Sequence, residues 1–566
     1  MSLCLKNEKS SRRNDLTSTN KRNHIFKYIK LAAPLATASQ GKVTYFLVIT
    51  LSFSSSYMHK LCQTQLAMTG KDAPPVKKIP IPILFYWETT KEKCTFEREK
   101  KKLGGSLQMG AKSRSFIVPI QHFLSRKTNA TVLLFVMAVL AAIIANTPLA
   151  EGYSQLLAYP VTLQVGPFNI FSHNGETMDL LTFANDVLMV LFFLNVGLEI
   201  KREGLVGELS SFRKAMFPVT AACGGMLFPV LVYLTICHTE PMSHGSAIPM
   251  ATDIAFSLAV LSLVKGVPTS LKTFLTALAV ADDLGGIIVI ALFYSTGINL
   301  AMLACGVGVI LLLYVLGRYA GVRNLWVYYL GLLFVWLFFL SSGVHTTIAG
   351  VLVAFTVPAK PRYDTKETAA RVKSLMALLR NEDDGKDSEK GLLPGEHINI
   401  LYSISNTTYH SVSPMQRMEA QLTPGVNWFI LPLFAFVNAG VRLSGVGFED
   451  LWGVTSAVAL GLMIGKPLGI WLFSRLYLWI THTPMPIGMH NKSLLGLGFL
   501  GGFGFTVSLF IASLSFVGDA AVLHLNEAKL GIFIGSIFSG IFGYLFLRHY
   551  FKKHHDIEEE LVAKKA

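Results

Sequence analysis

Long apolar runs, separated by short polar segments, dominate the chain beyond residue 128. A helix that crosses a bilayer needs about 20 mostly apolar residues, and its backbone must satisfy its own hydrogen bonds within the membrane. The pattern therefore predicts an all-α integral membrane protein with about twelve transmembrane helices. The runs lie near 129–148, 179–200, 214–237, 246–264, 271–295, 299–317, 323–341, 343–358, 425–443, 454–478, 493–517 and 529–548.

Composition and charge support this interpretation and orient the chain. Of the 566 residues, 52% are hydrophobic and 15% are charged, whereas a soluble domain carries charge on about a quarter of its residues. Lys and Arg gather on alternate connections between the runs, and such residues are kept on the cytoplasmic side, so both termini are predicted to be cytoplasmic. The first 128 residues hold 23 Lys and Arg against 7 Asp and Glu, which accounts for the net charge of +15. We interpret this basic end as a cytoplasmic flank next to membrane lipid, with no nucleic-acid partner.

The polar segments divide the chain into five parts. We expect a basic, disordered N-terminal extension, a cytoplasmic insertion that is helical near 366–380 and otherwise loose, and a cytoplasmic tail, with transmembrane helices 1–8 and 9–12 on either side of the insertion. The predicted boundaries are 1–110 for the extension, 111–358 for helices 1–8, 359–424 for the insertion, 425–549 for helices 9–12 and 550–566 for the tail.

Four charged residues fall inside the apolar runs. Asp253 lies early in one run, Asp282 and Asp283 are adjacent in the middle of another, and Lys466 lies in the middle of a third. Each costs roughly 2.5–3.5 kcal/mol at the bilayer centre, so together they would cost on the order of 10–14 kcal/mol if uncompensated. They must therefore pair, become neutral, or line a hydrated cavity.

The two adjacent carboxylates are expected to have different roles. Consecutive residues on a helix diverge by about 100°, so Asp282 and Asp283 cannot face the same partner. One carboxylate can bind a hard cation in a water-filled funnel while the other pairs with Lys466. Like charges in a poorly solvated site resist joint ionisation, which allows a proton and a sodium ion to compete there. The alternative is a purely structural Asp–Lys pair with Asp253 as a helix cap.

Two runs also contain helix-breaking residues. Pro249 precedes Ala251, Thr252 and Asp253, and five glycines fall within 495–505. Irregular backbone at membrane depth is tolerated where it lines a cavity. Both helices are predicted to be broken, with Asp253 and Lys466 compensating the dipoles of the half-helix ends.

From near Phe116 to Arg548 the sequence resembles the NhaA family of sodium/proton antiporters, for which broken helices at a midplane site are already described. The resemblance rests on seven segments: 183–203, 249–263, 274–295, 342–358, 428–441, 462–470 and 501–516. It implies an inverted-repeat fold in a bacterial inner membrane. In that fold two broken helices cross at mid-membrane, and the tandem aspartates lie at the base of a cytoplasmic funnel.

The resemblance also implies roles for individual residues. Asp283 would be the principal cation and proton carboxylate, with Asp282, the partner of Lys466, and Thr252 completing the site for the transported Na⁺. Asp253 and Lys466 would provide charge compensation and proton coupling. Further positions match family residues linked to pH response or to the outer end: Glu199, Glu203, His345, Glu419 and Asp186. For His345, a plain hydrogen-bonding role is an equal alternative, and Gln416 stands where the family usually has lysine.

The resulting hypothesis is an electrogenic, pH-regulated sodium(lithium)/proton antiporter for pH and sodium homeostasis. We expect no enzymatic activity and no cofactor besides the transported ions, because no nucleotide-binding motif occurs. A β-hairpin at 161–174 is predicted as a possible homodimer contact. The alternatives are another cation/proton exchanger, a sodium-coupled symporter of the same architecture and, more remotely, an intramembrane aspartyl protease, whose Gly-x-Gly-Asp motif is absent.

Overall fold

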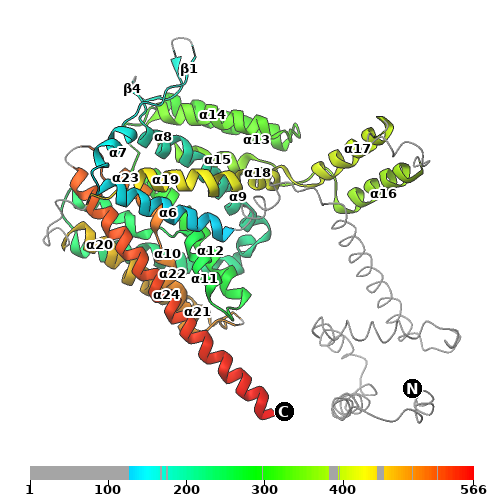
Figure 1. Cartoon of the computed structure of the whole chain (residues 1–566). Coiled ribbons are helices and arrows are strands. Elements are labelled where there is room, and N and C mark those ends of the chain that lie inside the picture. Colours follow the sequence, from blue (N-terminus) through cyan, green and yellow to red (C-terminus); the bar gives the residue numbers. More distant parts are fainter. Residues whose placement is uncertain are drawn as a thin grey trace, which may run out of the picture. The chain divides into compact units, whose positions relative to one another are not determined.

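The computed structural model describes residues 127–565 apart from 166–167, 174–175, 296, 382–392, 394, 443–451, 487 and 519–520. The chain divides into two compact units, Met1–Ser115 and Phe116–Ala566, and all described residues belong to the second. The predicted extension, residues 1–110, therefore lies outside the described residues. Figure 1 shows the second unit as a bundle of helices.

Helices occupy every predicted apolar run. In chain order they are α6 (Lys127–Ala145), α7 (Ala150–Leu157), α8 (Leu180–Phe183), η3 (Ala184–Leu188), α9 (Met189–Val206), η4 (Glu208–Ser210), α10 (Phe212–Ile236), η5 (Met242–Met250), α11 (Ile254–Leu263), α12 (Thr269–Phe293), α13 (Leu300–Arg318), α14 (Leu325–Ser342), α15 (Thr347–Thr356), α16 (Thr365–Asn381), α17 (Gly395–Ser411), α18 (Pro414–Gly425), η7 (Val426–Ile430), α19 (Leu431–Asn438), α20 (Val454–Leu460), η9 (Gly461–Gly465), α21 (Lys466–Thr481), α22 (Asn491–Gly501), α23 (Phe505–Ser515) and α24 (Val522–Lys565).

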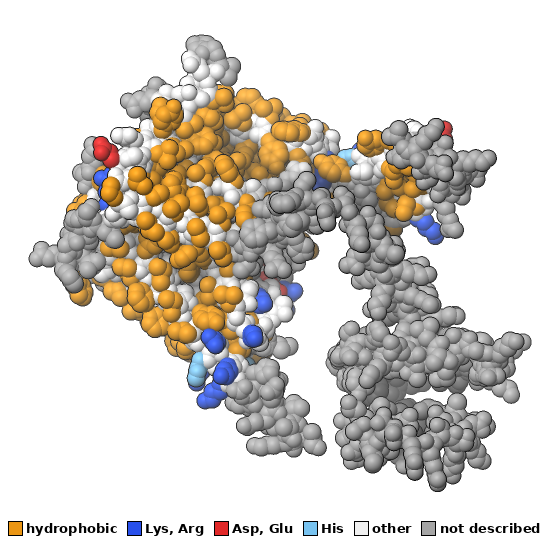
Figure 2. Space-filling view, in the orientation of Figure 1, with side chains coloured by type: hydrophobic (Ala, Val, Ile, Leu, Met, Phe, Trp, Pro, Cys, Tyr) orange, Lys and Arg blue, Asp and Glu red, His pale blue; other side chains and the backbone are white. Residues whose placement is uncertain are grey.

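The lengths and composition of these helices confirm a multi-pass helical membrane fold. Within the described residues, eight helices are long and apolar enough to cross a bilayer, or up to eleven if each of three bent pairs forms one span; α15 is apolar but shorter. Hydrophobic side chains cover most of the visible face of the bundle in Figure 2. Large hydrophobic residues such as Phe135, Leu311 and Phe538 are exposed, as expected for a surface that contacts lipid. The count of twelve spans stays a prediction.

Small residues allow the central helices to approach closely. α10 packs along α21, and a Cβ atom added to Gly224 or Gly469 would overlap the backbone oxygen of the other glycine. Such glycine contacts are a common basis of helix packing in membranes. They hold α21, and with it Lys466, against the centre of the bundle.

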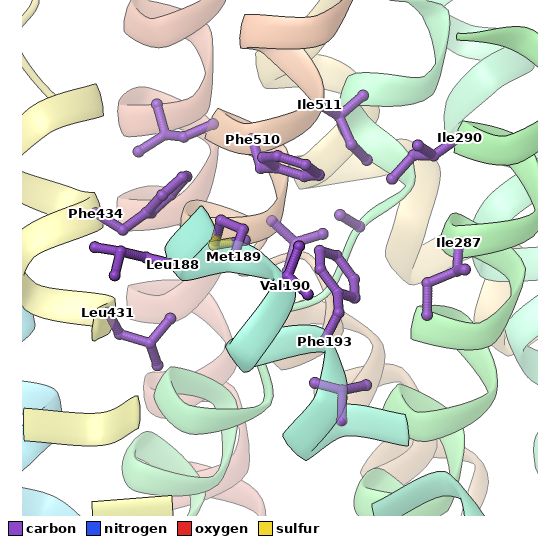
Figure 3. Close-up of a cluster of buried hydrophobic side chains, with 14 of the residues drawn as sticks. Leu188, Met189, Val190, Phe193, Ile287, Ile290, Leu431, Phe434, Phe510 and Ile511 are labelled. Atoms are coloured by element: carbon purple, nitrogen blue, oxygen red, sulfur yellow. The ribbon is translucent and has the colours of Figure 1, made fainter. Parts of the chain in front are cut away.

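Aromatic and aliphatic side chains from α9, α12, α19 and α23 fill the neighbouring core (Figure 3). The ring of Phe510 lies 5.6 Å from that of Phe193 and 6.3 Å from that of Phe434. Ile287 and Ile290 join this core from α12, about one and two turns beyond the tandem aspartates. The core therefore fixes the helix that carries both carboxylates.

The insertion differs from the prediction in two ways. Besides α16, the segment Gly395–Ser411 is helical and packs on α16, so the expectation of a loose remainder is wrong there. Residues 414–424, assigned to the insertion, are the first turns of a helix that runs from Pro414 to Asn438. Ser413 caps this helix by accepting a hydrogen bond from Gln416 N (3.2 Å), and Pro414 occupies its first position, where a missing N–H costs nothing.

Two small hairpins connect α7 with α8. β1 (Gln164–Val165) pairs with β2 (Phe168–Asn169), within the predicted hairpin, whose turn residues lie outside the described residues. A second hairpin, β3 (Ser172–His173) with β4 (Glu176–Thr177), was not expected. Its strands are only two residues long, too short for the alternation of apolar and polar positions that signals a strand.

Candidate functional site

Two broken helices meet at the centre of the site. η5 and α11 are bent by 44° across residues 251–253, and α22 and α23 by 49° across residues 502–504. The two breaks are joined by a hydrogen bond from Asp253 N to Phe503 O (2.6 Å). A Cβ atom on Gly504 would lie only 3.0 Å from Ala251 O, so glycine is needed where the chains touch. Each of the two runs that Pro249 and the glycines marked as interrupted is thus a bent pair of helices, and a single broken span in each place stays a prediction.

Asp253 caps both half-helices that start at the breaks. Its Oδ1 accepts from Phe256 N (3.2 Å) at the start of α11. Its Oδ2 accepts from the backbone N (3.2 Å) and the hydroxyl (2.6 Å) of Thr506 at the start of α23. One carboxylate therefore faces two positive helix ends, which explains how a buried acid is accommodated.

The opposite half-helix ends receive hydrogen-bond donors. Lys466 Nζ donates to Met250 O, the last carbonyl of η5, and to Asp282 Oδ2 (2.6 Å). At the end of α22, the Thr252 hydroxyl lies 3.0 Å from Gly501 O, and Ser257 donates to Leu500 O (2.7 Å). Lys466 thus satisfies a carbonyl at one negative helix end, and Ser257 satisfies a carbonyl at the other, while the single Thr252 hydroxyl proton is shared between Gly501 O and the closer Asp282 Oδ2.

The tandem aspartates face different surroundings. Asp282 is held by Lys466 and by the Thr252 hydroxyl, 2.5 Å from its Oδ2, while its Oδ1 is buried without a hydrogen-bond partner among the described residues. Within the same part of the chain Asp283 forms no hydrogen bond or ion pair through its side chain, and it lines a cavity of about 320 Å³. Thr252, Asp253 and Thr506 line the same cavity, whereas Asp282 and Lys466 do not. Asp283 is therefore the tandem carboxylate that solvent ions can reach.

The oxygen atoms around this cavity suit a hard cation, which prefers carboxylate, hydroxyl, carbonyl and water oxygens. Among the described residues, no three His, Cys, Asp or Glu side chains lie close enough together to hold a metal ion. A cation bound by Asp283 would therefore also need hydroxyl, backbone or water oxygens. Thr252 and Thr506 are hydroxyl candidates on the cavity wall.

An acidic cluster around one arginine forms the other end of the cavity. Arg202 lies 3.3 Å from Glu199 and 3.5 Å from Glu203, and it also pairs with Glu419 of α18. Glu199, Arg202 and Glu419 all line the cavity that reaches Asp283. The structure thus brings together three of the acids expected to respond to pH. Arg202 itself was not predicted as a site residue, although its i,i+3 spacing from Glu199 was visible in the sequence.

His345 and Asp186 lie apart from this cavity. His345 Nδ1 contacts the Thr347 hydroxyl (2.8 Å), and its ring meets that of Phe510 edge to face at 5.4 Å. Asp186 lies in the π-helical turn η3, and its backbone oxygen accepts from Trp336 Nε1 (3.0 Å). Neither residue lines the cavity that reaches Asp283.

Ser257 and Thr506 are site residues that the sequence analysis did not select. Both are almost fully buried and hydrogen-bonded at the crossing. A lone hydroxyl residue in an apolar run is a weak signal, because Ser and Thr often bond to their own helix backbone.

Broken helices that meet around buried charges define a class of protein, the secondary transporters. The family model described as Na⁺/H⁺ antiporter 1 matches residues 121–547, and the chain belongs to this family. Curated relatives carry the name Na(+)/H(+) antiporter NhaA. The protein from Porphyromonas gingivalis is 52% identical over 77% of this chain and 96% of its own length. Those from Bacteroides thetaiotaomicron and Helicobacter pylori (strain HPAG1) are 50% and 44% identical over 76% of this chain, covering 97% and 94% of their own lengths.

The double cap at Asp253 leads to a stability prediction. Asp253→Ala removes acceptors from two helix starts, each of which contributes about 0.5–2 kcal/mol, so we expect a lower thermal unfolding midpoint in detergent. Asn299→Ala is the matched control, because Asn299 caps only α13, through Ala301 N (3.1 Å) and Met302 N (3.4 Å). Equal shifts for the two variants would contradict the double cap.

Proposed function

We propose that this protein exchanges Na⁺, or Li⁺, for H⁺ across a bacterial inner membrane, and that the exchange is electrogenic, pH-regulated and serves pH and sodium homeostasis. The observation that carries the proposal is the position of Asp283, a buried carboxylate without a hydrogen-bond partner among the described residues, on the wall of the cavity. Family membership supports the identity of both ions.

In the proposed cycle a cation and a proton compete for one carboxylate. Deprotonated Asp283 binds Na⁺ together with hydroxyl and water oxygens, and Thr252 supplies one of these hydroxyls. Protonated Asp283 has no charge to offer the cation, so binding one ion releases the other. Asp282 next to it resists the accumulation of a second negative charge and so strengthens the competition.

Lys466 accounts for the proposed electrogenicity. The Asp282 carboxylate holds its ammonium, which is fully buried, at 2.6 Å. When Na⁺ enters beside Asp282 it competes for the same negative charge, which weakens the hold on the ammonium and favours loss of its proton. Two protons would then move for each sodium ion, one from Asp283 and one from Lys466, and a net charge would cross the membrane.

The cluster of Arg202 with Glu199, Glu203 and Glu419 supports a proposed pH response. Arg202 contributes positive potential to the cavity that leads to Asp283. We expect Arg202→Gln to shift the pH profile of exchange to more alkaline values. The remaining acids make the potential more negative, so protons are held more tightly and leave only at higher pH. The measurement is exchange rate against pH in everted vesicles.

Arg371→Gln is a matched control for that shift. Arg371 also pairs with a glutamate, Glu367 (2.9 Å), but the pair is exposed on α16 and does not line the cavity. Its removal should leave the pH profile unchanged. If the pH profile of Arg202→Gln coincided with that of the wild type, it would contradict a role of this cluster in the pH response.

The function itself is tested by adding sodium, lithium or potassium to everted vesicles that hold a proton gradient. Sodium and lithium should collapse the gradient, and potassium should not. Collapse by potassium alone would favour another cation/proton exchanger, and sodium uptake without proton movement would favour a symporter. A protease is disfavoured because Asp282 and Asp283 lie on one helix, so they cannot face one peptide bond from two sides as a catalytic pair does.

We further propose that both termini are cytoplasmic, that the 161–174 hairpin contributes to a homodimer, and that exchange needs no cofactor. The excess of Lys and Arg in the first 128 residues supports the orientation, as do Arg548, Lys552 and Lys553 at the end of the last apolar run. The family match, which begins at residue 121, leaves the extension outside the transport core. The two short hairpins offer backbone edges suited to pairing with a second copy.

A further inference from the structure

Three neutral polar side chains line the cavity one helical turn or more further in than its acidic residues. On α9, Asn195 lies four residues before Glu199. On α18 and η7, Thr423 and Asn427 lie four and eight residues after Glu419. Four residues make about one turn, so each side chain follows its acid along one helix face, away from the nearby helix end. Because α9 packs against α18 and η7, the three side chains, here called the neutral collar, belong to neighbouring walls (Figure 1).

A hydrogen bond joins the Asn195 amide to the Thr423 hydroxyl across the two walls. The hydroxyl oxygen lies 3.0 Å from the amide and 2.7 Å from Glu419 O. A hydroxyl has a single proton, and an amide can turn over without changing its shape. When Thr423 donates to the nearer oxygen, Glu419 O, the amide N–H of Asn195 donates to Thr423. The amide oxygen of Asn195, which forms no other side-chain hydrogen bond within the described part of the chain, is then available to an ion in the cavity.

Asn427 provides a second amide on the same wall as Thr423. It lies in the π-helical turn η7, and single π-helical turns occur frequently at functional sites. The side chain is half-buried, lines the cavity and forms no hydrogen bond to any residue that the structure describes. Amide groups that are shielded from bulk water normally find a partner. An unpaired amide on a cavity wall therefore indicates that water or an ion is its partner.

The neutral collar differs in character from the charged groups of the cavity. The acidic cluster and Asp283 can carry charge, whereas the collar is neutral, and its neighbours on these walls, Phe192, Val196 and Val426, are apolar. Amide and hydroxyl oxygens are suitable ligands for a hard cation. Because they carry no full charge, they hold a monovalent ion less tightly than a carboxylate does. A site through which ions pass needs this property, since each ion must both enter it and leave it.

We propose that the neutral collar is a transit site for the transported cation, whose oxygens replace part of the hydration shell of Na⁺ or Li⁺ on its way to Asp283 and so set the apparent affinity for the cation. This inference rests on the proposed exchange function. An ion that arrives partly dehydrated leaves fewer water molecules for Asp283 and Thr252 to displace. Because the collar contains no titratable group, its contribution does not depend on pH, in contrast to that of the acidic cluster.

The test measures sodium-driven proton release in everted vesicles against sodium concentration, at a neutral and at an alkaline pH. Asn195→Leu/Asn427→Leu replaces both amides by apolar side chains of similar size. Asn427→Leu alone breaks no hydrogen bond to a described residue, so it decides the question if the double variant does not fold. Asn185→Leu is the matched control. Asn185 is also 9% exposed and accepts a hydrogen bond from Asn438 Nδ2 (2.9 Å) on another helix, but it does not line the cavity.

We expect both collar variants to raise KM for sodium at either pH, the double variant by about fivefold or more, as for the loss of one or two neutral contacts. The value of kcat and the pH profile should stay nearly unchanged. Such a combination means that binding common to the ground state and the transition state has been lost. Asn427→Ser, which keeps a neutral oxygen, should give an intermediate KM. Asn185→Leu should lower the thermal midpoint and leave KM unchanged.

The proposal is overturned if the wild type exchanges sodium for protons and the double variant keeps the wild-type KM, or if Asn185→Leu raises KM by the same factor. A fall in kcat at unchanged KM would also overturn it, because the collar would then act in the exchange step and not in the passage of the ion. Failure of the wild type to release protons on addition of sodium would contradict the proposed function itself. The same set of vesicles therefore distinguishes the two failures.

Discussion

Asp283→Asn should abolish sodium-driven proton release while the protein still inserts and folds. The amide has nearly the same shape as the carboxylate but cannot carry a negative charge or exchange a proton at physiological pH, so neither ion would bind. Because the Asp283 carboxylate forms no hydrogen bond to a described residue, its replacement should break no structural contact and the thermal midpoint should be preserved. The measurement is proton release from everted vesicles after a sodium pulse, alongside thermal unfolding of the purified variant.

Asp364→Asn is the matched control for this prediction. It makes the same chemical change at an exposed position at the start of the insertion, outside the cavity. Its exchange should equal that of the wild type. Substantial sodium-dependent proton release by Asp283→Asn would show that another group carries the proton.

Removing the buried charge of Lys466 should have the largest effect on stability. Its ammonium bonds both Asp282 and the last carbonyl of η5, and the two paired side chains are 0% and 1% exposed. Breaking a buried ion pair by removing one partner costs about 3–5 kcal/mol, because the other charge is left without compensation. Lys466→Met should therefore lower the thermal midpoint strongly.

A double variant separates this charge effect from a simple loss of packing. In Lys466→Met/Asp282→Asn neither side chain is charged, and the amide can still accept from Thr252. Its midpoint should recover part of the loss seen for Lys466→Met alone, since the effects of two groups in contact are not additive. Losses that simply add would mean that Asp282 and Lys466 do not stabilise one another.

The membrane fold and the place of the site could be predicted from the sequence because burying a charge in lipid is so costly. Asp253, Asp282, Asp283 and Lys466 stood out for that reason, and the structure brings all four to one crossing. Helical periodicity showed that the tandem aspartates diverge. It did not show which of them meets Lys466, because that depends on the rotation of α12 against α21.

Features that depend on distant contacts were missed. Arg202 of α9 meets Glu419 of α18, and no local pattern connects positions so far apart in the chain. The helix that starts at Pro414 had a local signal, a serine followed by proline, but its polar first turns resembled the charged insertion before it.

The central claim is that one cavity carboxylate exchanges Na⁺ for H⁺, and calorimetry tests it most directly. Sodium is titrated into the purified protein in buffers of different ionisation enthalpy, so that the heat reports how many protons leave as each sodium ion binds. The account predicts proton release by the wild type, exceeding one proton per ion if Lys466 also contributes, and no sodium binding by Asp283→Asn. Saturable sodium binding to the wild type without proton release at any pH between 6 and 9, roughly the range in which such carboxylates and lysines titrate when perturbed, would contradict it.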